Sequence, residues 1–104
     1  MTFRSLLTLA TAFAVLPGIA GAADIEAGRA TSEEWCTDCH VIGADGAFKQ
    51  DTPSFAAIAV YRSEEQIRQR IMFPAVHAAM PRMGLVLDPR TIDNLVAYIA
   101  SLEE

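Results

Sequence analysis

The sequence predicts a small all-α domain. Apolar residues near the C-terminus recur at steps of three and four, the spacing of one helix face: Ile92, Leu95, Val96, Ile99 and Leu102. No run of alternating β-branched residues lies between turn signals, so a sheet is not expected. With 104 residues, the chain has room for one domain.

The first expected helix begins after Asp24, a good N-cap, and runs to about Trp35. Glu26 lies in its first turn, where a negative charge favours the helix dipole. From Val41 to Pro53 the composition changes to Gly, Asp and Lys without a hydrophobic period. This segment predicts a loop that wraps around something rather than packing on itself.

Two short helices follow. Ser54 can cap a helical turn that runs through Val60. Ser63, with Gln66 three residues later, forms a capping-box pattern, which predicts a middle helix over about 64–73.

The last helix has the clearest start. Pro74 ends the middle helix, and the stretch to Leu87 stays irregular. Asp88 then caps the last helix, and Pro89 takes its first position, where the missing N–H costs nothing.

Residues 1–22 have the three zones of a secretory signal. A short head carries Arg4, an apolar run covers 6–16, and small residues occupy 20–22. A membrane anchor is the alternative, but a proline–glycine pair stops the run before the roughly 20 apolar residues that a span needs. We expect a cleaved signal peptide, a periplasmic domain at 23–104, and no membrane span after cleavage.

Charge and size narrow the function. The chain has 13 acidic and 8 basic side chains, and loss of Arg4 with the signal leaves 7 basic ones, a net charge of −6. Nucleic acid and anionic lipid are therefore not expected partners. So short a chain is marginally stable unless a disulfide, metal or cofactor adds to its core. The two cysteines are close together in sequence, so a disulfide between them cannot link distant segments. A large apolar cofactor would complete the core.

Cys36-Thr37-Asp38-Cys39-His40 is a C-x-x-C-H arrangement, the pattern of c-type haem attachment. Two thiols at this spacing can add to the two vinyl groups of a haem, and the next residue places an imidazole against the iron. The motif predicts one covalent haem c, with Cys36 and Cys39 as thioether attachments and His40 as the proximal axial ligand.

Two other sites use similar residues. A redox dithiol would need a βαβ context and a helix that begins at the cysteines, whereas these cysteines follow a helix. A structural zinc site needs four ligands, and His77 is the only further Cys or His. We favour haem over both alternatives.

The chain resembles the class I cytochromes c, the small monohaem family, over essentially all of 23–104. The resemblance rests on Gly28, the C-x-x-C-H residues, the Met80-Pro81 pair and the closing-helix segment 95–99. It implies a small helical domain wrapped around one covalent haem. In that family the first and last helices cross closely, so Gly28 and Tyr98 resemble the contact pair, although Ser32 stands where a bulky residue is common.

Met80 is the leading candidate for the distal axial ligand of the iron. It lies in an irregular segment well after His40, and a loop can wrap to the far face of a haem. The resemblance adds the proline that follows it. Met83 and His77 remain alternatives, and a second imidazole would lower the potential relative to His/Met ligation.

The resemblance also makes the carbonyl of Pro53 the acceptor for the second ring N–H of His40, which would fix its tautomer. The alternative is a loop proline that opens a turn. Six side chains could form pocket walls or ordinary core: Trp35, Phe55, Ile58, Tyr61, Phe73 and Leu87.

With both axial positions filled, the expected function is single-electron transfer between periplasmic or membrane redox partner proteins, and not enzymatic catalysis by this chain alone. The alternatives are an electron-transfer subunit of a dehydrogenase complex and a haem-based ligand sensor. Glu33, Glu34 and Asp38 suggest docking to basic or weakly charged patches. We expect a monomer.

Overall fold

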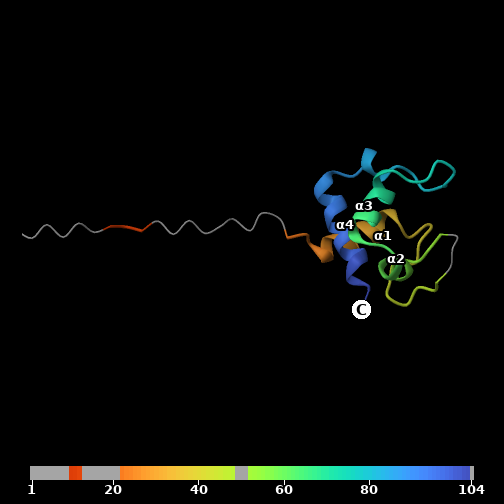
Figure 1. Cartoon of the computed structure of the whole chain (residues 1–104), viewed down its shortest axis with the longest axis horizontal. Coiled ribbons are helices and arrows are strands. Elements are labelled where there is room, and N and C mark those ends of the chain that lie inside the picture. The colour runs from red at the N-terminus through yellow and green to blue at the C-terminus, as the bar shows by residue number, and fades with distance from the viewer. Residues whose placement is uncertain (1–9, 13–21, 49–51, 104) are drawn as a thin grey trace, which may run out of the picture.

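The structure, a computed structural model, describes residues 10–12, 22–48 and 52–103. Most of the predicted signal peptide, 1–22, lies outside these residues. The described part contains four α-helices, one short 3-10 helix and no strand, which confirms the all-α prediction (Figure 1). In chain order these elements are α1 (Ile25–Trp35), α2 (Phe55–Tyr61), α3 (Glu64–Met72), η1 (Met83–Leu85) and α4 (Pro89–Ser101).

Each α-helix begins at the cap residue that the sequence predicts. The caps are Asp24, Ser54, Ser63 and Asp88, and each side chain accepts a hydrogen bond from the backbone N–H three residues on. These bonds satisfy N–H groups that have no partner within the helix. The capping box between Ser63 and Gln66 is also present.

Helix ends differ slightly from the predictions. Helix α2 continues one residue beyond Val60, and α3 ends at Met72 with Phe73 as its C-cap. The stretch predicted to be irregular contains η1, a single turn of three residues. No helix in the described ranges is long and apolar enough to cross a membrane.

Helices α1 and α4 cross at very close range. A methyl group at Gly28 would lie 2.0 Å from the backbone carbonyl oxygen of Asn94 and 2.9 Å from the Cβ of Tyr98. The expected contact between Gly28 and Tyr98 is therefore present. Ser32, one turn later, is fully buried and donates its hydroxyl to the carbonyl of Gly28 at 2.8 Å. Two small residues thus let the backbones approach.

The core lies along the apolar stripe of α4. Leu95 and Val96 are almost completely buried there, and α2 and α3 pack against the same helix. An ion pair between Arg68 and Asp93 joins α3 to α4 at the surface. Helix α4 is therefore the element around which the others assemble.

Candidate haem site

A cavity of about 610 Å³ opens beside the core and collects the residues of interest. Cys36, Cys39 and His40 line it, and so do Pro53 and Met80. The loop that carries Met80 follows α3, and the cysteines follow α1 (Figure 1). Chain segments far apart in sequence therefore line the same cavity. The lining is mainly apolar, which suits a group that must be kept from water.

The end of α1 presents the motif to the cavity. Cys36 is the C-cap of α1 and donates its backbone N–H to Ser32. The carbonyl of Cys36 accepts the N–H of Cys39 at 3.3 Å and that of His40 at 2.8 Å. The five residues therefore form a tight turn that continues the helix, and their three reactive side chains reach one wall.

His40 has one ring nitrogen held by the backbone. Its Nδ1 lies 2.6 Å from the carbonyl oxygen of Pro53. A carbonyl can only accept, so Nδ1 carries the proton and Nε2 keeps a free lone pair. The ring of Phe55 lies 5.3 Å away, centroid to centroid. This arrangement prepares Nε2 to bind a metal, because a fixed tautomer and orientation raise ligand basicity.

Three candidates for the second axial ligand reach the cavity, namely Met80, Met83 and His77. Met83 is only 3% exposed and belongs to the hydrophobic core. His77 is exposed, whereas Met80 is half-buried and packs at the edge of the core. The lining of the cavity does not by itself decide among the three, but Met83 is a buried member of the core, whereas Met80 lies only at its edge.

The chemistry of the cysteines disfavours a redox dithiol. Burial raises the pKa of the Cys36 thiol to about 11, so the thiol stays protonated at neutral pH. A reactive dithiol requires the opposite, a lowered pKa and a thiolate.

A zinc site is also disfavoured. The described residues hold no cluster of three or more His, Cys, Asp or Glu side chains that could bind a metal ion. A structural zinc site uses four such ligands. Of the three chemistries that the motif allows, haem attachment agrees best with this geometry.

The pocket-wall expectations were partly wrong. Trp35, Phe55 and Ile58 line the cavity, but Tyr61 and Phe73 do not and are 73% and 63% exposed. Tyr61 lies in the last turn of α2 and packs against Phe48 instead. Leu87 packs against the core rather than the cavity.

Sequence reasoning missed a cavity-facing side of α3 and α4. Ile67 and Ile71 line the cavity at the spacing of one helix face, and this pattern was visible in the sequence. Leu95 and Ile99 of α4 join them. Arg62 and Arg70 supply positive charge to an otherwise mainly apolar lining, which nothing in their local sequence indicated.

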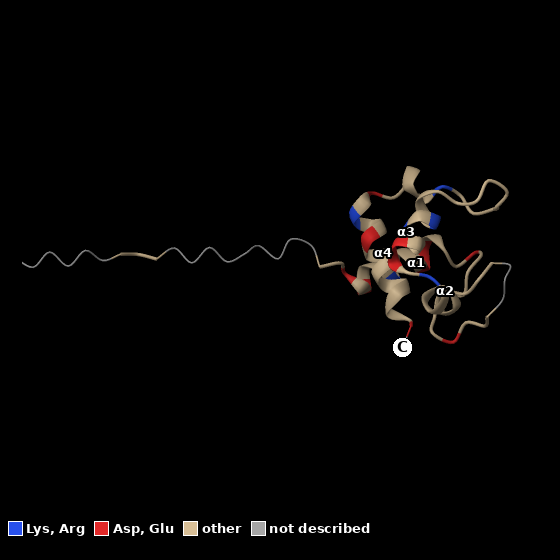
Figure 2. Ribbon diagram, in the orientation of Figure 1, with Lys and Arg blue, Asp and Glu red and all other residues tan. Residues whose placement is uncertain are grey.

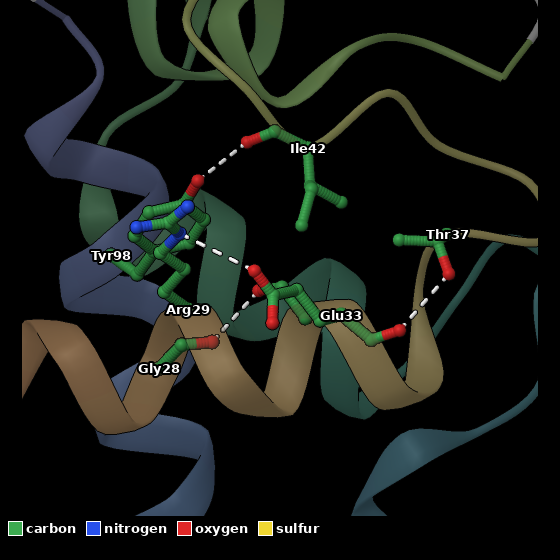
Figure 3. Close-up of polar contacts among 7 residues, drawn as sticks. Gly28, Arg29, Glu33, Thr37, Ile42 and Tyr98 are labelled. Carbon is green, nitrogen blue, oxygen red and sulfur yellow. Dashed lines mark hydrogen bonds and ion pairs between the residues drawn. The ribbon is translucent and has the colours of Figure 1, made fainter.

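A part-buried hydrogen bond supports the segment that follows the motif. The Tyr98 hydroxyl donates to the carbonyl of Ile42 at 2.7 Å, which ties α4 to the chain just beyond His40 (Figure 3). Burial raises the pKa of Tyr98, so the hydroxyl keeps its proton and remains a donor. On α1, Arg29 pairs with Glu33 at 3.4 Å (Figure 3).

Comparison with known proteins agrees with this site. Residues 23–99 match the family model described as cytochrome c oxidase, cbb3-type, subunit III. No curated protein gives a significant match. The matched range contains α1, α2, α3 and η1, most of α4, and every residue placed at the cavity. The chain therefore belongs to this family of monohaem, class I-like cytochrome c domains, whose cofactor is haem c with its iron and whose role is haem-based electron transfer.

Proposed function

We propose that this chain is an exported single-electron carrier with one haem c, attached through Cys36 and Cys39 and ligated by His40 and Met80. The observation that carries the proposal is the cavity, because it brings two thiols, an imidazole and a thioether to one apolar space. Family membership supports the haem, and the geometry of this chain supports the residue assignments.

The residues present fit a haem. Nε2 of His40 is free for iron while the Pro53 carbonyl holds Nδ1, and the two thiols lie on the same turn. Arg62 and Arg70 offer cations for the two carboxylates of a haem. When bound, haem supplies reversible one-electron chemistry at iron. The chain's own contribution is to bind and orient the haem and to exclude water from it, since burial and axial ligands set the reduction potential.

Met80 is the distal ligand in this proposal because it lines the cavity and is only partly buried at the edge of the core, whereas Met83 is buried within the core. A protein with both axial positions filled has no open iron site for a small substrate. Electron transfer, rather than catalysis or gas sensing, is then the function.

We further propose that residues 1–22 are removed as a signal peptide and that the domain works in the periplasm as a monomer, with no membrane span and no nucleic acid partner. The family match begins at residue 23, which supports this division of the chain. Its partners would be redox proteins.

The docking prediction concerns Glu33, Glu34 and Asp38. Figure 2 marks the acidic residues in red and the basic residues in blue along the ribbon. Glu33 is paired with Arg29, and Arg62 and Arg70 line the cavity. In this proposal Arg62 and Arg70 face the haem carboxylates, so acidic docking to a basic partner rests on the exposed Glu34 and Asp38.

Spectra of the exported protein test the ligand set. The ferric protein should show the sulfur-to-iron charge-transfer band, and Met80→Ala should abolish it. Met83→Leu and His77→Gln should keep the band, and so should Met72→Leu, which changes a methionine that does not line the cavity. A wild-type ferric spectrum without the band, or its survival in Met80→Ala, would refute the assignment.

Covalent attachment has its own test. Haem should stay with the polypeptide in acidified organic solvent, and the mass should exceed that of the polypeptide 23–104 by one haem. Replacing both Cys36 and Cys39 by Ala should release the haem under the same treatment.

A second candidate is a fixed electron-transfer subunit, such as that of a dehydrogenase complex. The description of the matching family names an oxidase subunit, which favours a complex of some kind. Co-purification of the exported chain with a larger membrane enzyme in gentle detergent would support it. A ligand sensor would instead bind carbon monoxide in the reduced wild-type protein, whereas the carrier should bind it only in Met80→Ala.

A further inference from the structure

The loop that carries Met80 is bounded by two prolines. Pro74 follows Phe73, the C-cap of α3, and Pro81 lies two residues before η1. Among the described residues of the loop, one backbone hydrogen bond lies inside it, from the N–H of Ala78 to the carbonyl of Ala75 at 2.9 Å. Because the loop has so few internal hydrogen bonds, the position of Met80 depends on the contacts between the two ends of the loop, which we call its base.

The residues just outside the two prolines meet at that base. The guanidinium carbon of Arg82 lies 5.5 Å from the centroid of the Phe73 ring, within the range of a cation–π contact. The chain has no carboxylate between Glu65 and Asp88. Within the described residues the ion pairs are those of Arg29 and Arg68, so the Phe73 ring is the contact that Arg82 makes.

A second contact closes the base beneath this pair. A methyl group at Gly84 would lie 2.9 Å from the Sδ and Cε of Met72, so η1 packs tightly on the end of α3. This contact also explains the exposure of Phe73. With Met72 turned to η1, the next side chain faces outward, where its ring receives Arg82.

We propose that the Phe73–Arg82 pair is a clasp that positions Met80 as the distal ligand. The inference rests on the proposed function, specifically on the assignment of Met80. In this proposal Met80 leaves its place when the loop ends separate, and this separation breaks the contact between Arg82 and Phe73. The clasp therefore lowers the population of the open loop and with it the access of other ligands to the iron.

The test measures imidazole binding to the oxidised, haem-loaded protein, followed by loss of the sulfur-to-iron band. An exposed cation–π contact corresponds to about a two- to fivefold change in an equilibrium constant. Arg82→Gln and Phe73→Leu should each tighten imidazole binding by about this factor. Arg82→Lys, which keeps the cation, should stay near wild type. The double variant should bind no more tightly than either single one, since both remove the same contact.

Arg90→Gln is the matched control, because it removes one exposed arginine from the first turn of α4, away from the loop. It should leave imidazole binding unchanged. The clasp is overturned if Arg82→Gln and Phe73→Leu bind imidazole like the wild type while the band is present. It is also overturned if Arg90→Gln has the same effect, because the change would then report total charge.

The failure of the proposed function looks different. In that case the wild type lacks the band, and Met80→Ala binds imidazole as the wild type does. That result overturns the ligand assignment and the clasp together. The first two results overturn the clasp alone and leave Met80 as the ligand.

Discussion

Adding one methyl group at Gly28 should force α1 away from α4 and destabilise the domain. The new carbon would lie 2.0 Å from the carbonyl oxygen of Asn94 and 2.6 Å from its carbonyl carbon, where ordinary contact begins at 3.4 Å. The obstructing atoms belong to the backbone, so no side-chain rotation relieves the clash. The two helices must separate by more than an ångström.

The expected size of the effect follows from two opposing terms. Overpacking a well-packed contact costs about 1–3 kcal/mol, and a backbone clash belongs at the upper end. Alanine in place of a helical glycine gains about 0.8–1.0 kcal/mol. Gly28→Ala should therefore lose about 2 kcal/mol of unfolding free energy, because the clash exceeds the gain in propensity.

Urea unfolding of the haem-loaded protein, followed by far-ultraviolet circular dichroism, measures the change. The midpoint should fall with an unchanged slope. Ala30→Gly, an exposed position on the same helix, measures the propensity term alone and should lose about 1 kcal/mol. A Gly28→Ala protein as stable as the wild type, or more stable, would refute the close approach of α1 and α4.

Three further predictions concern single contacts. Tyr98→Phe removes the part-buried hydrogen bond to the carbonyl of Ile42 and should cost about 0.5–1.5 kcal/mol in the same urea assay; no loss would mean that water replaces the hydroxyl. Thr52 has a φ of 49°, so Thr52→Gly should relieve strain of about 1 kcal/mol, and a lower midpoint would contradict this strain. Hydrogen bonds from Thr91 lower the pKa of Asp88 below its ordinary 3.8, so its stabilisation is present above about pH 4 and is lost as pH falls through the lowered pKa. In Asp88→Asn the free energy of unfolding should therefore fall less steeply as pH is lowered below about 4. If it falls as steeply as in the wild type, other carboxylates cause the loss of stability at acid pH.

The sequence predicts helix starts well here because each start depends on a local hydrogen bond. Asp24, Ser63 and Asp88 each serve backbone N–H groups within three residues, so the cause and its effect lie in one short stretch. The apolar face of α4 can likewise be predicted from one short stretch of sequence. The ends are less predictable, since α3 ends at Met72, whose side chain packs on η1, an element distant in the sequence.

The candidate site also has a part that can be predicted from local sequence and a part that cannot. The turn around Cys36, Cys39 and His40 is local, and its consequences can be read from the five residues. The wall of the cavity depends on which helix faces arrive there, and this is a property of the assembled fold. Tyr61 and Phe73 therefore failed as wall residues although their chemistry suited the role.

The cavity wall and the hydrophobic core are largely the same residues, and this overlap bears on both stability and function. Six of the nine buried side chains of the core also line the cavity, namely Phe55, Ile67, Ile71, Met83, Leu95 and Ile99. A haem in the proposed position would bury the apolar surface that these side chains turn toward the cavity, so binding and folding stabilise one another. Changes on this wall should therefore alter both the potential and the stability. The crossing at Gly28 lies outside the cavity lining, and a change there should reduce stability while leaving the electronic surroundings of the iron intact.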